Sequence, residues 1–230
     1  MLPAPIALLG ALALAPVADA QITEVGPTGT AAAGTPSCPT NCIAVTRTTG
    51  YQQSVDGKVG AFRVPADGRI VAWTVTLGTP GKKQVKFFDD NYGGEAQAGI
   101  AVLNMGKKAR ATLQAQSPTV KLTPYFGQTV QFPLTETLPV EKNDIVALTV
   151  PTWAPALAVG LTDGAAWRAS RQSACKAQST TQQQTAQTTV GETKQYVCKY
   201  LTARLTYTAT LVTNPQAPDQ SSGKKSTRGR

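Results

Sequence analysis

The chain has 230 residues and no histidine, and its 22 lysines and arginines outnumber its 13 acids, giving a formal net charge of +9. Without histidine, Ser-His-Asp and Cys-His nucleophile systems and imidazole metal ligands are excluded. Only 15% of the residues are charged, against about 25% in a typical soluble domain. The 32 threonines and 18 glutamines supply polarity instead, and such a composition, rich also in glycine and proline, is typical of short strands and turns.

The first 20 residues have the features of a secretory signal peptide. An apolar run from Ile6 to Leu14 precedes the small-x-small pattern Ala18-Asp19-Ala20, which predicts cleavage before Gln21. The run lacks the usual opening lysine or arginine, and a transmembrane anchor is the alternative. However, the stretch from Leu2 to Val17 contains three prolines and is shorter than the roughly 20 apolar residues that a bilayer requires. We therefore expect a secreted, extracellular protein with no membrane span after cleavage.

The four cysteines predict disulfides in an oxidising compartment. Cys38, Cys42, Cys175 and Cys198 allow three connectivities, of which we favour 38 to 42 and 175 to 198. A zinc site is the alternative, but the spacings and the absence of histidine do not match the common structural sites. Residues 21–41, which are rich in glycine, threonine, alanine and proline, are predicted to be a flexible linker.

Period-two alternation of apolar and polar residues dominates the region from 42 to 213. It is clearest from Tyr200 to Val212, and it recurs from Arg69 to Leu77, where Trp73 is predicted to lie in the core. Such alternation describes strands with one buried and one exposed face. Turn signals separate about ten short strands, and no window keeps a helical apolar period. The sequence therefore predicts one all-β domain, an antiparallel β-sandwich that is jelly-roll-like.

Two segments differ from the strands in composition. Residues 176–195 are mostly threonine and glutamine with one branched aliphatic residue, too little apolar area to offset the entropy of ordering, so they are predicted to form a mobile loop. Residues 214–230 carry a net charge of +3 on a background of proline, serine and glycine. They are predicted to be a disordered basic tail.

Two short motifs carry a resemblance to a known group of proteins. The first runs from Asp67 to Trp73 as DGRIVAW, and the second from Leu138 to Leu148 as LPVEKNDIVAL. Both are similar to motifs in secreted jelly-roll β-sandwich proteins of unknown function from high-GC bacteria. Asn143 stands where that family tends to carry glycine, a substitution that a left-handed turn position tolerates. The resemblance implies the fold and export, and it transfers no catalytic residue.

An acidic run follows a strand that we expect at Phe87 and Phe88. Asp89, Asn91 and Glu95 place oxygen ligands around Gly93, which is the chemistry that calcium prefers. The run lacks the twelve-residue EF-hand pattern, and a polar loop that binds nothing is the alternative. No other cofactor is expected.

Aromatic residues beside arginines are the second candidate site. Trp153 lies between two prolines at an expected strand end, and Trp167 is close to Arg168 and Arg171. An exposed indole suits stacking on a sugar ring, and the arginines could bind anions. The alternative is that both tryptophans pack in the core, where large aromatic residues mostly lie.

The excess of basic over acidic residues indicates which functions to expect. Positive charge favours glycans or anionic cell-wall polymers as partners, although scattered lysines also serve solubility and the protection of edge strands. Motifs for sequence-specific nucleic-acid recognition are absent. We expect a non-catalytic binding or structural module at the cell envelope, with weak carbohydrate or anionic-polymer binding as the first hypothesis. The alternatives are a glycan hydrolase or lyase that uses two carboxylates, and a self-assembling jelly-roll protein.

Overall fold

The computed structural model describes residues 19–27, 34–172, 175 and 183–215. Almost all of the predicted signal peptide and of the predicted basic tail therefore lies outside the described residues, as does the first part of the predicted mobile loop, 176–182.

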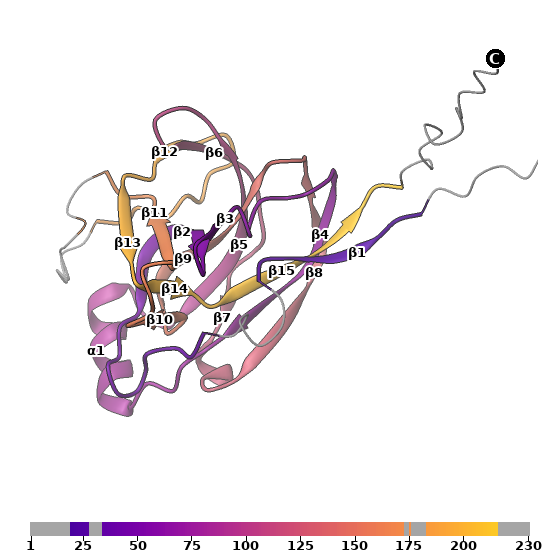
Figure 1. The fold of residues 1–230 in the computed structure, drawn as a ribbon. Coiled ribbons are helices and arrows are strands. Elements are labelled where there is room, and N and C mark those ends of the chain that lie inside the picture. Colours follow the sequence, from indigo (N-terminus) through magenta and orange to yellow (C-terminus); the bar gives the residue numbers. More distant parts are fainter. Residues whose placement is uncertain (1–18, 28–33, 173–174, 176–182, 216–230) are drawn as a thin grey trace, which may run out of the picture.

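The described residues form an antiparallel β-sandwich, which confirms the predicted all-β fold (Figure 1). The larger sheet has the order β12 (Thr193–Gln195), β6 (Arg110–Gln116), β5 (Gln97–Met105), β9 (Ile145–Ala154), β2 (Val45–Val55), β11 (Ala166–Ala169) and β13 (Cys198–Leu201), with β3 (Lys58–Val59) on β2 and β7 (Val120–Lys121) on β5. The smaller sheet has the order β1 (Ile22–Val25), β15 (Tyr207–Thr213), β4 (Gly68–Thr76) and β8 (Thr129–Val140). β10 (Leu157–Val159) and β14 (Ala203–Leu205) form a separate pair.

The chain passes between the two main sheets repeatedly, as it does in a jelly roll. β2 belongs to the large sheet, β4 to the small one, β5 to the large one, β8 to the small one and β9 to the large one. Apolar residues that alternate along these strands meet between the layers, so Trp73 is 1% exposed, as predicted. Other side chains with almost no exposed surface there are Phe62, Ile70, Ile100, Leu148 and Leu211.

The segment from Tyr200 to Val212, expected as one strand, is divided among three sheets. β13, β14 and β15 follow one another, and the break after β13 falls at Thr202, whose φ is 52°. The polar residues Arg204 (4% exposed) and Thr206 (3% exposed) are buried as well, so the alternation of burial is lost at the breaks, although the apolar residues Ala203, Leu205 and Tyr207 stay buried. Leu201 is the exception, since 55% of its surface is exposed.

The expectation of a strand at Phe87 and Phe88 is wrong, because these residues lie in a helix, α1 (Lys82–Tyr92). Its first turn is closed by a hydrogen bond from the Gly81 N–H to Oε1 of Gln84 (2.7 Å). Its C-cap is Gly93, which has a φ of 97° and is in the left-handed conformation that glycine adopts readily. In Figure 1 the helix lies at one end of the molecule, away from β1 and β15. A short 3-10 helix, η1 (Thr123–Tyr125), precedes β8.

The segment before the predicted domain also differs from expectation. β1 falls within the predicted linker, and it pairs with β15 from Ile22 opposite Val212 to Val25 opposite Ala209. Val25 is 2% exposed, so this strand belongs to the packed domain.

The second half of the predicted mobile loop packs on the threonine face of the large sheet. Gln187 is fully buried, its backbone N–H donates to Oγ1 of Thr49 (2.9 Å), and its side chain donates to the carbonyl of Ala111 (3.1 Å). Thr49 in turn shares a hydrogen bond with Thr149 (3.0 Å). Hydrogen bonds between buried polar groups thus hold a segment that has too few apolar residues to be held by burial alone.

The two motifs that carry the family resemblance are neighbours in the fold. Gly68, Arg69 and Ile70 on β4 pair with Val140, Pro139 and Leu138 on β8. A carboxylate oxygen of Asp67 accepts a hydrogen bond from the backbone N–H of Lys142 (2.7 Å). Asn143 has a φ of 79°, which confirms the left-handed turn expected there.

Candidate ligand-binding groove

Trp153, the first residue of the predicted aromatic platform, is a core residue with no exposed surface. Its indole N–H donates to Oδ1 of Asp89 (2.8 Å) and to the carbonyl of Gly94 (3.1 Å). Its ring stacks on Phe88, with centroids 4.7 Å apart. The expectation that Trp153 presents a face to a sugar is therefore wrong, because helix α1 and the loop after it cover the indole.

The three residues of the predicted calcium site serve other contacts. Asp89 receives the Trp153 hydrogen bond, and Asn91 donates from its side chain to the carbonyl of Phe87 (2.7 Å) within the helix. Glu95 lies 3.0 Å from the Lys121 ammonium, which lowers the pKa of that carboxyl below its ordinary value. Within the described residues, no group of three acidic or cysteine side chains is close enough to hold a metal ion. Asp89 and Asn91 are two residues apart on helix α1, so their side chains point to different sides of it, whereas alternate residues of an extended segment point to the same side.

Trp167 and Arg171 are brought together, whereas Arg168 points elsewhere. Trp167 on β11 stacks against Tyr200 on β13, with ring centroids 4.5 Å apart and an interplanar angle of 22°. Arg171 donates from Nη1 to the Tyr200 hydroxyl (2.9 Å) and from Nη2 to the carbonyl of Thr46 (2.6 Å). Arg168 donates to Oε1 of Gln53 (2.9 Å) and to the carbonyl of Tyr196 (2.8 Å). Because side chains alternate along a strand, Trp167 and Arg168 lie on opposite faces of β11.

The stack of Trp167 and Tyr200 forms part of the lining of a groove of about 830 Å³. One wall is helix α1, the other is made by β13, β14 and β10, and the segment around Cys42 joins them. Most lining side chains are apolar or aromatic: Cys42, Ile43, Ala44, Val45, Phe87, Phe88, Tyr92, Leu157, Val159, Trp167, Cys175, Tyr200, Leu201 and Ala203. The volume is in the range of roughly 300 to 1,000 Å³ that is typical of small-molecule sites.

The groove exposes large apolar groups at its two walls. Phe87 on the helix is 48% exposed and Leu201 on β13 is 55% exposed. Tyr200 is partly exposed, whereas Trp167 beneath it is only 4% exposed. The aromatic residue that a ligand would meet is therefore Tyr200, and the predicted role of Trp167 as an exposed platform is corrected to that of a support.

Gly50 on β2 leaves room for the Trp167 indole. A Cβ at this position would lie 2.9 Å from Cζ3 and 3.0 Å from Cε3 of Trp167, and 3.1 Å from Cδ1 of Leu205. These distances are shorter than normal van der Waals contacts, so any side chain at residue 50 would displace the indole. The glycine thus fixes the depth of the groove floor.

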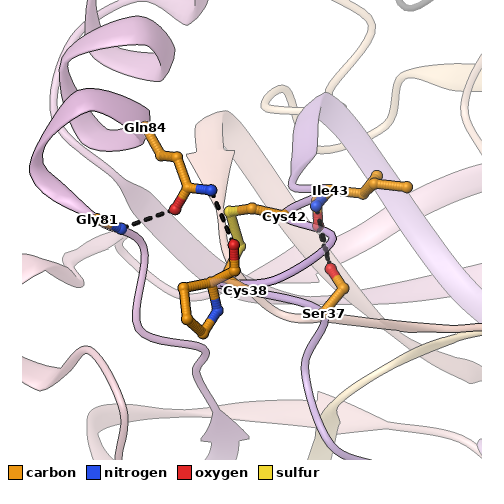
Figure 2. Close-up of a disulfide and its surroundings, with 7 residues drawn as sticks. Ser37, Cys38, Cys42, Ile43, Gly81 and Gln84 are labelled. Atoms are coloured by element: carbon orange, nitrogen blue, oxygen red, sulfur yellow. Dashed lines mark hydrogen bonds between the residues drawn. A yellow bond between two sulfur atoms is a disulfide. The ribbon is translucent and has the colours of Figure 1, made fainter.

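The two disulfides form as predicted, and each supports one wall. Cys38–Cys42 holds the segment that faces the start of α1, where the Gln84 side chain bridges the Gly81 N–H and the carbonyl of Pro39 (2.7 and 2.9 Å; Figure 2). Cys175–Cys198 anchors the first residue of β13, the strand that carries Lys199, Tyr200 and Leu201. Cys42 and Cys175 both belong to the groove lining.

The charges in the lining are all positive. Lys83 on α1, Lys199 on β13 and the 8%-exposed Arg171 belong to it, and none of the described residues that line the groove is Asp or Glu. The remaining lining residues, Thr46 and Gln84, are neutral. A second, smaller hollow of about 390 Å³ lies at the turn from β5 to β6 beside Lys107, Lys108 and Arg110, and the side chains that line it are polar.

Comparisons of the chain with protein-family models, with curated proteins and with solved structures gave no match. The resemblance to secreted jelly-roll proteins therefore stays a prediction. In the part of the chain that the structure describes, no helix combines the length and the apolar character needed to cross a membrane.

Most of the groove was missed by reasoning from the sequence. The sequence pattern predicts a strand at Phe87 and places Leu201 on the buried face of another strand. A helix signal was present in the spacing of Val85, Phe88 and Tyr92, followed by Gly93, but the short acidic run obscured it. Nothing in the sequence indicates that α1 packs opposite β13.

Proposed function

We propose that this protein is an exported, non-catalytic β-sandwich module that binds a small, mainly apolar molecule in the groove between α1 and β13. The observation that carries the proposal is the apolar lining of that groove, with Phe87 and Leu201 left exposed at its walls. Pockets that bind small molecules are typically concave and mainly apolar, with a few polar groups that orient the ligand. Here Lys83, Arg171 and Lys199 are those polar groups.

Export is supported by two kinds of observation. Two disulfides close within the described residues, and disulfides of this kind persist in oxidising compartments outside the cytosol. The signal-like sequence of the first 20 residues points the same way. Secretion and a place at the cell envelope remain part of the proposal.

An apolar ligand fits this groove better than a glycan does. Sugar recognition needs hydrogen-bonding side chains around an exposed aromatic face, and the groove offers mainly aliphatic and aromatic carbon. Trp153 is buried, so the pair of exposed tryptophans on which the carbohydrate hypothesis rested is not available. The groove lining also contains no carboxylate among the described residues, so the proposal includes no hydrolytic step.

Self-assembly is the second candidate, because Phe87 and Leu201 could also be covered by another copy of the chain. The two functions predict different results for dilute protein. A monomer that binds a small apolar molecule supports the ligand site, whereas a dimer that excludes the same molecule supports self-assembly. Sedimentation velocity of the purified protein distinguishes the two states.

The experiment that tests the proposal titrates the purified protein with N-phenyl-1-naphthylamine, a neutral fluorophore that brightens in apolar surroundings. We expect one saturable site. Phe87→Asp and Leu201→Asp should each weaken binding by about tenfold or more, because each places a charge in the apolar wall.

Val59→Asp is the matched control. Val59 is 76% exposed on β3 and does not line the groove, so this substitution changes the same kind of surface without touching the site. Absence of saturable binding, or an equal loss in all three variants, would contradict the proposal.

A further inference from the structure

The basic and the acidic residues of helix α1 lie on different sides of it with respect to the groove. Lys83, Gln84, Phe87 and Phe88 line the groove, whereas the acidic residues of α1 lie outside it. Asp89 receives the Trp153 hydrogen bond, and Asp90 pairs with Lys86 at 2.9 Å on the exposed surface. The helix therefore offers the groove a cation and keeps its carboxylates away from it.

The opposite wall also contributes cations to the groove. Lys199 extends from β13 between Cys198 and Tyr200, and Arg171 is held beneath by the Tyr200 hydroxyl and the carbonyl of Thr46. Both of those acceptors are neutral, and the two hydrogen bonds orient the guanidinium. Cations on both walls beside low-dielectric apolar surface raise the local concentration of an anion.

We infer that the ligand of this groove is an amphipathic anion, a free molecule with an aliphatic body and one carboxylate, whose body packs between Phe87 and Leu201 and whose head group lies against Lys83 and Lys199. This inference rests on the proposed function, since it names the chemical class that the same groove takes. Apolar contact supplies most of the affinity, and the cations select the anion over a neutral molecule of the same shape.

The lysines suit a head group that remains partly in water. Both Lys83 and Lys199 are exposed, and each can move its ammonium to meet a carboxylate while its methylene stem covers the apolar wall. Exposed ion pairs contribute modestly, so the selection expected from two lysines is about tenfold at low salt.

The test compares decanoate with decan-1-ol, which has the same chain length and no charge, by calorimetric titration below the concentration at which either aggregates. We expect decanoate to bind about tenfold more tightly at low ionic strength, and the ratio to shrink toward unity at about 0.5 M salt. In Lys83→Met/Lys199→Met the preference for decanoate should disappear while decan-1-ol binds as before, because methionine keeps the apolar stem.

Lys58→Met/Lys142→Met is the matched control, since it removes the same charge from two exposed lysines that do not line the groove. It should keep the preference. Equal binding of decanoate and decan-1-ol by the unaltered protein would overturn the anion inference and leave the apolar site standing. Binding of neither would remove the proposed function itself. Retention on phosphatidylglycerol vesicles that decanoate does not displace would overturn the assignment to a free molecule and indicate a membrane surface.

Discussion

Trp167 and Tyr200 face each other across β11 and β13 as a stacked pair, with ring centroids 4.5 Å apart. Trp167 is buried against Gly50, and Tyr200 is partly exposed to the groove. The position of the accessible ring is therefore set by a glycine on a third strand. Arg171 fixes the hydroxyl end of the same ring.

Gly50→Ala tests this relation directly. The added methyl would lie 2.9 Å from the Trp167 ring, so the indole must shift, and overpacking of this kind lowers the free energy of unfolding by about 1 to 3 kcal/mol. Ligand binding in the groove should weaken as well. Gly106→Ala is the control, because a Cβ there meets nothing closer than the carbonyl oxygen of Arg110 at 3.7 Å. Chemical denaturation of both variants gives the answer, and equal stability would show that the indole is not held by Gly50.

Trp153→Phe tests whether Trp153 acts as a core residue or as a platform for a ligand. The substitution removes the donor that satisfies Asp89 and leaves a void beside Phe88, so the free energy of unfolding should fall by about 1 to 3 kcal/mol. Binding of a sugar cannot depend on a side chain that has no exposed surface. Thermal unfolding measures the loss. Unchanged stability together with lost binding to cell-wall glycans would contradict the buried role.

The two disulfides should differ in their contributions to stability. The loop closed by Cys175–Cys198 spans 23 residues in sequence separation and that of Cys38–Cys42 spans 4. On the chain-entropy relation these loops contribute about 3.4 and about 2 kcal/mol. Replacing each pair with serine and measuring urea denaturation tests the order. Both replacements should also weaken groove binding, since each disulfide supports one wall, and an unchanged affinity in both variants would show that neither wall depends on its disulfide.

The free energy of unfolding should fall at alkaline pH because two tyrosines are buried. Burial raises the pKa of Tyr196 and of Tyr207 well above the ordinary value near 10, so the folded protein keeps both phenol protons after the unfolded chain has begun to lose them. The stabilisation is complete below about pH 10 and is lost as the pH rises from there toward the folded pKa values, by up to about 1.4 kcal/mol per pH unit for each phenol.

Urea denaturation from pH 8 to about pH 11.5 measures that slope. Tyr196→Phe and Tyr207→Phe should each flatten it by one group, although each also removes a hydrogen bond, to Gln187 and to the carbonyl of Val146 respectively. A slope that both variants leave unchanged would contradict this assignment.

The buried apolar positions were predictable, whereas the burial of the polar residues Arg204 and Thr206, where the strands change sheets, was not. Ala203, Leu205, Tyr207, Ala209 and Leu211 are buried as the pattern indicates, since a period of two describes the local backbone whichever sheet it joins. The break after β13 was not predictable, because it falls at Thr202, which adopts a positive φ. The same break turns Leu201 out of the core and into the groove wall.

The candidate site could not be predicted for a related reason. It depends on α1, whose aromatic pair Phe87 and Phe88 also fits a strand, and on the packing of that helix opposite β13. Long-range pairing of this kind leaves no trace in local composition. The ordered packing of residues 183–195 could not be predicted for the same reason. This segment is held by threonines from distant strands, as Gln187 is by Thr49.

Photoaffinity labelling is the most direct test that the groove between α1 and β13 is a binding site. The probe is a decanoate that carries a diazirine on its chain, and mass spectrometry locates the labelled residues. We expect labelling within Lys82–Tyr92 and Cys198–Leu201 that excess decanoate suppresses. Labelling that excess decanoate does not suppress, or that concentrates at exposed apolar residues elsewhere such as Ile22, Val59 and Val190, would contradict it.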